Sequence, residues 1–321
     1  MNDIFLNMVP KVSVIIPIYG VEQYIRMCAT SLFDQTLEDV EFIFVNDCTT
    51  DRSMEILADV IELKRERLKK MRCTVRIEKM ERNSGLAAVR KYGISLASGQ
   101  YIIHCDSDDW IEPNIYKILY ERAINDNADI VFCDYYIANE SRKKLFSKNI
   151  KQLNREYILR RLLTESALNP VWTALVRKPL YDSIIYPIGS QAEDNTFMIQ
   201  LCFFSNSYSY VSTPLYYYRT NPISISHSIE IESLIKRYQQ LKDNRDIIVH
   251  FFEREHISDQ YKKEMQAFLF RAKKILDSRL SDSRCRTLWM NTYPESAKTI
   301  IINPYIPLRD KVDYYMKRLF G

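Results

Sequence analysis

The chain has 321 residues, which is enough to bury a sizeable core and to form more than one packing unit. Its 45 basic and 41 acidic residues leave a formal net charge of only +4, which gives no case for a nucleic-acid partner. No pair of its six glycines forms G-x-G-x-x-G, so a dinucleotide or Walker-type phosphate loop is excluded. The seven cysteines lack C-x-x-C spacing and are expected to be reduced core residues, not disulfides or zinc ligands.

The pattern of apolar residues bears on where the protein works. Residues 1–10 lack a basic region followed by an apolar stretch, which is the mark of a signal peptide. No run in the chain approaches the ~20 apolar residues that a membrane span needs. The sequence therefore predicts a cytoplasmic protein that is soluble or peripheral on the inner face of the cell membrane.

The first part of the chain alternates apolar strands with amphipathic helices. Strands are predicted at 12–17, 40–45, 75–78 and 101–105, and helices at 21–35, 52–70 and 86–97. This alternation, with right-handed crossovers, predicts an α/β fold with a mostly parallel sheet and helices on both of its faces.

Distinctive residues directly follow the first two strands. Tyr19 lies between Pro17 and Gly20 at the tip of the first strand, where its ring could stack on a base or a sugar. Asp47 is the first acid after the second strand, and an Asx-turn is the alternative explanation for it. Asp51 is expected to cap the helix that follows.

The fourth strand stops abruptly at Asp106-Ser107-Asp108-Asp109. If the backbone stays extended, Asp106 and Asp108 point the same way and could converge on one hard divalent cation. Such a cation would neutralise a departing diphosphate. The alternative is a polar strand end or an Asp-rich turn without a ligand.

The second part of the chain repeats the alternation less regularly. Helices are predicted at 112–127, 156–163 and 197–204, strands at 129–136 and 211–218, and a charged loop near 142–144. The loop 186–194 carries Glu193 and Asp194 directly before a helix, where a general base or a helix cap would both fit.

A change of composition after Ser228 predicts a boundary near residue 229, with a helical region at 229–321. The preceding domain, 1–228, is expected to consist of a nucleotide-binding half, 1–110, and an acceptor-binding half, 111–228. The last helix starts after Pro307 and carries apolar residues on one face and basic residues largely off it. This helix could lie on an anionic membrane or dock its apolar face on the protein, and the sequence does not decide between these two.

Taken together, these features resemble family 2 glycosyltransferases of the GT-A (Rossmann-like) fold, over roughly residues 11–228. The matching positions are the strand 14–19, the aspartate turn 46–51, Asn83-x-Gly85 with Arg90, Asp106-x-Asp108-Asp109, and Glu193-Asp194 followed by Phe197. The resemblance does not reach the C-terminal helices.

The resemblance implies how the nucleotide would be held. Asp47 would accept a hydrogen bond from the uracil of a UDP-sugar, Tyr19 would stack near that base, and Arg90 would contact phosphate or ribose. The remaining members of the implied nucleotide-binding set are Pro17, Asn83, Asp106 and Ser107.

The resemblance also implies a metal and a base. Asp106 and Asp108 would ligate Mg²⁺ or Mn²⁺, and His227 is either a third ligand or a surface loop histidine. Asp194, with Glu193 beside it, would be the general base.

Three further residues have expected places. Trp172 and Asp109 are expected near the acceptor or the donor sugar, although a core position for Trp172 is equally compatible with the sequence. Trp110 is expected to pack under the acidic loop. Cys48 departs from the family, which usually has glycine there, so the turn must avoid a positive φ or carry strain.

These roles imply an inverting, metal-dependent transfer of a sugar from a UDP-sugar to a glycan acceptor, expected to be lipid-linked, in surface polysaccharide synthesis. One alternative is a sugar-nucleotide nucleotidyltransferase, although that class wants a glycine-rich loop after the first strand, where only Gly20 is available. A second is a non-catalytic nucleotide-sugar-binding protein of the same fold. The donor sugar, the acceptor, the linkage and the oligomeric state do not follow from the sequence.

Overall fold

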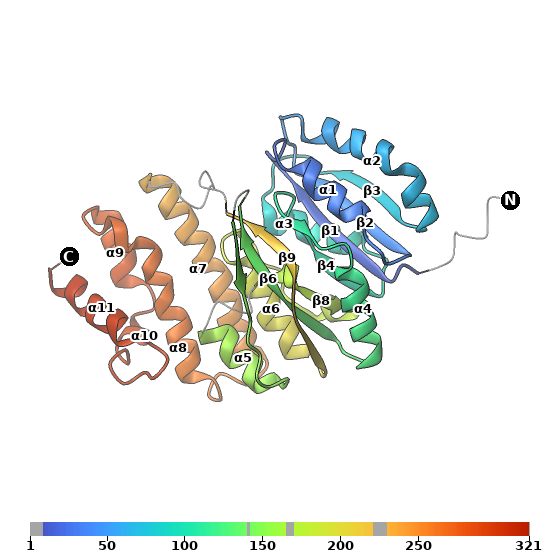
Figure 1. The fold of residues 1–321 in the computed structure, drawn as a ribbon. Coiled ribbons are helices and arrows are strands. Elements are labelled where there is room, and N and C mark those ends of the chain that lie inside the picture. The colour runs from blue at the N-terminus through green and yellow to red at the C-terminus, as the bar shows by residue number, and fades with distance from the viewer. Residues whose placement is uncertain (1–8, 140–141, 165–169, 221–229, 321) are drawn as a thin grey trace. The chain divides into compact units, whose positions relative to one another are not determined.

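The computed structural model describes residues 9–139, 142–164, 170–220 and 230–320 (Figure 1). The chain divides into two compact units. Unit 1 comprises Met1–Arg155, Pro170–Ile184 and Leu201–Asn221, and unit 2 comprises Glu156–Asn169, Ile185–Gln200 and Pro222–Gly321. The single boundary predicted near residue 229 differs from this division, because two earlier segments belong with the C-terminal helices.

The described residues of unit 1 form a nine-stranded sheet in the order β3-β2-β1-β4-β8-β6-β9-β5, with β7 paired to β6 (Figure 1). The strands are β1 (Val12–Ile18), β2 (Val40–Asn46), β3 (Thr74–Lys79), β4 (Tyr101–His104), β5 (Trp110–Ile111), β6 (Ile130–Ala138), β7 (Lys143–Phe146), β8 (Ala174–Arg177) and β9 (Tyr208–Arg219). Pairing is parallel from β3 to β4, as the alternation predicted, and mixed beyond β4.

Helices cover both faces of this sheet. They are α1 (Ile25–Phe33), α2 (Ser53–Lys70), α3 (Leu86–Leu96) and α4 (Ile115–Asn125), with 3₁₀ helices η1 (Val171–Thr173) and η2 (Lys178–Ser183). Val14 and Phe42 share a buried cluster with residues of α1, α2 and α4. Ile15, which alternates to the other face, meets α3 at Gly93, where a Cβ atom would lie 2.5 Å from Cγ2 of Ile15. Glycine therefore allows α3 to lie directly on β1.

The charged loop predicted near 142–144 is corrected by the structure. Lys143 and Lys144 begin β7, which pairs antiparallel with the end of β6 and has largely exposed side chains. Lysine-rich segments of this kind suit an edge strand, because their charge discourages pairing with another chain. A polar composition therefore concealed a strand here.

Unit 2 is helical. It contains α7 (Ile231–Arg254), α8 (Lys262–Phe270), the 3₁₀ helix η4 (Arg271–Arg279), α9 (Ser283–Asn291), α10 (Pro294–Ala297) and α11 (Leu308–Phe320), most of α5 (Arg155–Thr164) and the start of α6 (Glu193–Phe204). Asn244 of α7 is 1% exposed and holds the loop before α6, accepting from the N–H of Ile188 at 3.0 Å and donating to the carbonyl oxygens of Gly189 and Gln191. This contact explains why the segment from Ile185 belongs with α7. No helix of the described residues is both long and apolar enough to cross a membrane.

Candidate active site

The carboxyl ends of three adjacent parallel strands carry the first group of predicted site residues. Ile18 of β1 pairs with Asn46 of β2, and Ile15 of β1 pairs with His104 of β4. Tyr19, Asp47 and Asp106 therefore follow these strands at the same edge of the sheet. Ligands of open α/β sheets bind at this edge.

Asp47 organises the loop that leads into α3. Its side chain is 4% exposed, and its two carboxylate oxygens accept from the backbone N–H groups of Ser84 at 2.7 Å and Gly85 at 2.9 Å. Each oxygen keeps a second lone pair, so one more donor such as a base N–H can still be accommodated. The neighbouring Asn83 is exposed. The position suits the predicted nucleobase contact. Asp47 also holds the loop before α3 through these two hydrogen bonds.

Of the two outcomes expected for Cys48, the structure has the strained one. Its φ is 58°, in the left-handed region that favours glycine. Its thiol donates to the carbonyl oxygen of Met80 at 3.0 Å, which holds the side chain against the segment after β3. The aspartate turn therefore keeps the geometry of a glycine turn at the expense of strain.

The segment after β1 is tied to the turn after β2. The N–H of Gly20 donates to the hydroxyl of Thr49 at 2.9 Å, and the N–H of Glu22 donates to Asp51 at 2.9 Å. Asp51 also accepts from the N–H of Ser53 at the start of α2, but the N-cap position of this helix is Arg52, one residue after the predicted cap. With the backbone held here, the ring of Tyr19 remains 49% exposed and available for stacking.

Arg90 reaches the acidic loop from α3. The side chain is 1% exposed, and its Nη2 donates to Oδ1 of Asp106 at 3.0 Å. The close approach of α3 to the sheet at Gly93 brings this helix near the end of β4. Arg90 thus orients Asp106, and a contact of Arg90 with phosphate or ribose stays a prediction.

The three acids of the loop have different surroundings. Asp108 is partly exposed, and burial, followed by the charge of Asp106, raises its pKa to about 6. Asp109 is 1% exposed, and its two oxygens accept from the hydroxyl of Tyr216 and the N–H of Arg219, both at 2.7 Å. Burial raises the pKa of Asp109 well above its usual value. This placement makes Asp109 an anchor of the loop and does not favour the predicted contact with an acceptor.

Tyr216 and Arg219 of β9 are site residues that the sequence did not reveal. The Tyr216 hydroxyl also accepts from the N–H of Asp106 at 3.1 Å, and Nε of Arg219 donates to the carbonyl oxygen of Asp108 at 2.8 Å. The Arg219 guanidinium lies over the rings of Trp110 at 4.7 Å and Tyr24 at 4.9 Å. Strand β9 therefore holds the acidic loop at three residues: the N–H of Asp106, the carbonyl oxygen of Asp108 and the carboxylate of Asp109.

The two tryptophans of unit 1 pack within the protein. Trp172 is 4% exposed and stacks on Tyr216 and Tyr218, with ring centroids 4.2 and 5.5 Å apart. Of the two explanations offered for Trp172, this burial supports the core position. Trp110 stacks on Tyr217 at 5.1 Å beside the acidic loop, as its predicted packing role requires.

Asp106 and Asp108 are the residues that could hold a divalent cation. The raised pKa of Asp108 reflects burial beside the charge of Asp106, which a divalent cation between the two carboxylates would relieve. Within the described ranges, no group of three or more His, Cys, Asp or Glu side chains is arranged to hold a metal ion. Two carboxylates suit Mg²⁺ or Mn²⁺, whose remaining positions are filled by phosphate and water. His227 lies outside the described residues.

Glu193 and Asp194 open α6, in its first turn, and Glu193 is 3% exposed. The N-terminal end of a helix stabilises an ionised carboxylate. These acids belong to unit 2, whereas the acidic loop belongs to unit 1. The meeting of Asp194 with Asp108 at one substrate stays a prediction.

Comparison with known proteins adds to this geometry. Residues 13–185 match the family described as Glycosyl transferase family 2. Over 274 residues the chain is 31% identical to EpsH of Bacillus subtilis (strain 168), a protein named as a glycosyltransferase, covering 81% of this chain and 74% of EpsH.

Two solved structures share the fold. S. aureus TarS in complex with UDP-GlcNAc superposes with a TM-score of 0.58 at 21% identity, covering 90% of this chain and 91% of TarS. The mannosyltransferase PcManGT of Pyrobaculum calidifontis, in complex with GDP-Man and Mn²⁺, gives a TM-score of 0.56 at 14% identity over 97% and 86% of the two chains. At such identities the likeness shows the fold alone, and it confirms the predicted GT-A class.

Proposed function

Because the chain belongs to glycosyltransferase family 2, we propose that it transfers a sugar, with inversion, from a UDP-sugar to a glycan acceptor in surface polysaccharide synthesis. The observation that carries this proposal is the pair Asp106 and Asp108, on a loop held by Tyr216 and Arg219 beside Asp47. Family membership favours sugar transfer over the nucleotidyltransferase alternative. A lipid-linked acceptor is part of the proposal.

The donor nucleotide is proposed from the residues at the sheet edge. Asp47 presents carboxylate oxygens that can accept from the N–H of uracil, and the exposed ring of Tyr19 can stack on the base. The fold shared with TarS, which was solved with UDP-GlcNAc, supports uridine. PcManGT was solved with GDP-Man, so the guanosine alternative belongs in the test.

The acids of the site have two separate proposed roles, metal binding and removal of a proton. Asp106, oriented by Arg90, and Asp108 would hold Mg²⁺ or Mn²⁺, which supplies positive charge to the departing diphosphate. Asp194 would remove the proton from the acceptor hydroxyl as the new bond forms, with Glu193 beside it. Asp194 lies in the first turn of α6, and the N-terminal end of a helix favours the charged carboxylate that a general base requires.

The test is release of nucleoside diphosphate from a panel of UDP-sugars and GDP-mannose, with and without Mn²⁺. We expect Mn²⁺-dependent UDP release, and a decrease of about 100-fold in Asp108→Asn, because the cation supplies several kcal/mol to the transition state. Asp59→Asn, whose side chain is 66% exposed on α2, is the matched control and should keep full activity. Release from GDP-mannose alone would overturn the uridine assignment.

Asp194→Asn separates binding from transfer. With an acceptor present we expect its turnover to fall about 10²–10⁴-fold, while calorimetry shows UDP binding unchanged. Turnover left intact by both Asp108→Asn and Asp194→Asn would disprove the mechanism.

A further inference from the structure

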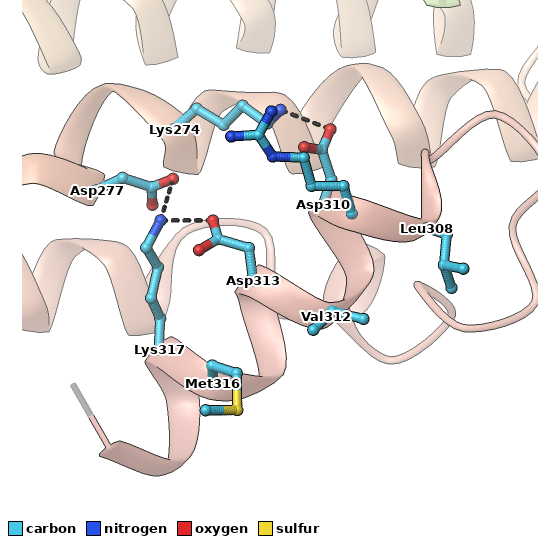
Figure 2. Close-up of a pocket in the computed structure, with 9 residues that line it drawn as sticks. Lys274, Asp277, Leu308, Asp310, Val312, Asp313, Met316 and Lys317 are labelled. Carbon is cyan, nitrogen blue, oxygen red and sulfur yellow. Dashed lines mark hydrogen bonds and ion pairs between the residues drawn. The ribbon is translucent and has the colours of Figure 1, made fainter.

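Helix α11 has one face that is docked within unit 2. Tyr314 is 4% exposed, and its ring lies 5.5 Å from that of Phe270 and 5.1 Å from that of Trp289. Two ion pairs join α11 to η4 near this contact: Lys274 with Asp310 at 2.5 Å, and Lys317 with Asp277 at 2.8 Å (Figure 2). Aromatic packing and ion pairs therefore set the position of α11. The helix does not need the apolar residues on its other face for this docking.

The apolar stripe faces away from this contact. It consists of Leu308, Val312, Met316 and Leu319, which recur at the spacing of one helix face and are between 53% and 76% exposed. Figure 2 shows Leu308, Val312 and Met316 among the residues that line an open pocket together with Lys274 and Asp277, and their high exposure shows that nothing within the described residues covers them.

The stripe continues beyond the helix. Ile301, which is 65% exposed, lines the same shallow hollow as Leu308, Val312 and Met316, and the next residue, Ile302, is 80% exposed. Four of these apolar side chains share one hollow, with Leu319 one turn further along α11 and Ile302 next to Ile301 in the sequence. Exposed apolar patches of this kind mark interaction sites.

Basic residues border the stripe on both sides. At 3.6 residues per turn, Arg309 falls on one flank of the stripe and Lys311 on the other. Within the described part of the chain neither forms an ion pair, and Lys311 donates to the carbonyl oxygen of Ile301. The acids of the helix, in contrast, are neutralised: Asp310 pairs with Lys274, and Asp313 pairs with Lys317. The exposed face is therefore apolar along its centre and positively charged along its edges.

We propose that this face of α11, together with Ile301 and Ile302, lies on the surface of a lipid bilayer that contains anionic phospholipid. Apolar residues between flanking cations match the layered chemistry of such a surface, acyl chains below and negative headgroups beside them. A second copy of the chain fits less well, because a two-fold contact would bring Arg309 and Lys311 toward the same cations of the other copy. Helix α11 has 13 residues and the bilayer core needs about 20, so the helix lies on the membrane and does not cross it.

The test is sedimentation of the purified full chain with vesicles of phosphatidylcholine alone or mixed with phosphatidylglycerol. We expect about thirtyfold tighter binding to the mixed vesicles, which is the contribution of two cations near an anionic surface. Replacing Leu308, Val312 and Met316 with serine should lower binding to the mixed vesicles at least about tenfold, because it removes much of the buried apolar area. Replacing Arg309 and Lys311 with glutamate should abolish the preference for anionic lipid.

The matched control carries three serines at exposed apolar positions elsewhere. These positions are Leu63, Ile124 and Ile188, which are 75%, 51% and 75% exposed. This control should bind mixed vesicles like the unaltered chain. Circular dichroism should show native helix content in every variant, because the apolar positions and Arg309 are solvent-exposed and Lys311 is at least partly so.

Two results would overturn the proposal. One is equal sedimentation of the unaltered chain and the serine variant of α11. The other is no binding to mixed vesicles together with a dimer, seen by light scattering, that the same variant abolishes, because that result assigns the face to a second copy of the chain. Neither readout depends on sugar transfer, so the outcome is independent of the proposed function.

Discussion

Replacing Tyr216 with phenylalanine tests whether β9 holds the acidic loop in place. The change removes one hydroxyl, which donates to Asp109 at 2.7 Å and accepts from the N–H of Asp106 at 3.1 Å. Burial, followed by the charge of Asp109, raises the pKa of Tyr216 well above its usual value, so the hydroxyl stays protonated and able to donate. The ring remains and keeps its stacking on Trp172.

The magnitude follows from the groups left without partners. The buried carboxyl oxygen of Asp109 costs about 1–3 kcal/mol when unsatisfied, and the lost bond to the Asp106 N–H adds about 0.5–1.5 kcal/mol. We therefore expect the free energy of unfolding to fall by about 2–4 kcal/mol. Urea unfolding followed by tryptophan fluorescence measures this, because Trp110 and Trp172 both lie in unit 1.

Tyr116→Phe is the matched control for this experiment. Tyr116 is as buried as Tyr216, each being 1% exposed, and its hydroxyl has no hydrogen-bond partner within the described residues. Removing that hydroxyl should leave stability unchanged or slightly increased, because no bond is lost and one buried polar group disappears. We also expect weaker Mn²⁺ binding in Tyr216→Phe and not in Tyr116→Phe. Equal losses of stability in the two variants would refute the role of Tyr216 in holding the loop.

Three further predictions concern unit 1. In Asp47→Asn the amide NH₂ replaces one carboxylate oxygen, so one of the two loop N–H groups loses its acceptor. We expect the free energy of unfolding to fall by about 1–3 kcal/mol and calorimetry to show weaker UDP binding. Unchanged affinity would contradict this. Cys48→Gly relieves the strain of the positive φ and should raise the free energy of unfolding by about 0.5–1 kcal/mol, less the contribution of the lost thiol hydrogen bond. Urea unfolding measures this change. The hydrogen bond from Arg72 lowers the pKa of Asp39 from 3.8, so this pair stabilises the fold above about pH 4, and its contribution is lost as the pH falls through the lowered pKa. Arg72→Met should therefore flatten the dependence of stability on pH in that acid range, and an unchanged acid-unfolding curve would contradict the assignment.

The order of elements in the first part of unit 1 could be predicted from the sequence because each signal is local. Apolar runs of strand length alternate with helical patterns, and parallel strands place their carboxyl ends at one edge. Tyr19, Asp47 and Asp106 therefore follow three adjacent strands at that edge of the sheet. The strand β7 escaped prediction because Lys143 and Lys144 resemble a loop until the pairing with β6 is seen.

Which side chains hold the site was decided by tertiary structure alone. Tyr216 and Arg219 reach Asp106 and Asp108 across separations of 110 and 111 residues, and no local pattern encodes such a contact. The burial of Trp172 likewise depends on rings supplied by β9.

The two faces of α11 divide in the same way. The sequence by itself determined that the helix is amphipathic, because that property depends only on the spacing of its own residues. Only the structure decided which face is buried. Tyr314 packs against Phe270 and Trp289, whereas the stripe from Leu308 to Leu319 is exposed. A side chain is buried only when another part of the chain packs against it, and the spacing of residues within α11 cannot say which part that will be.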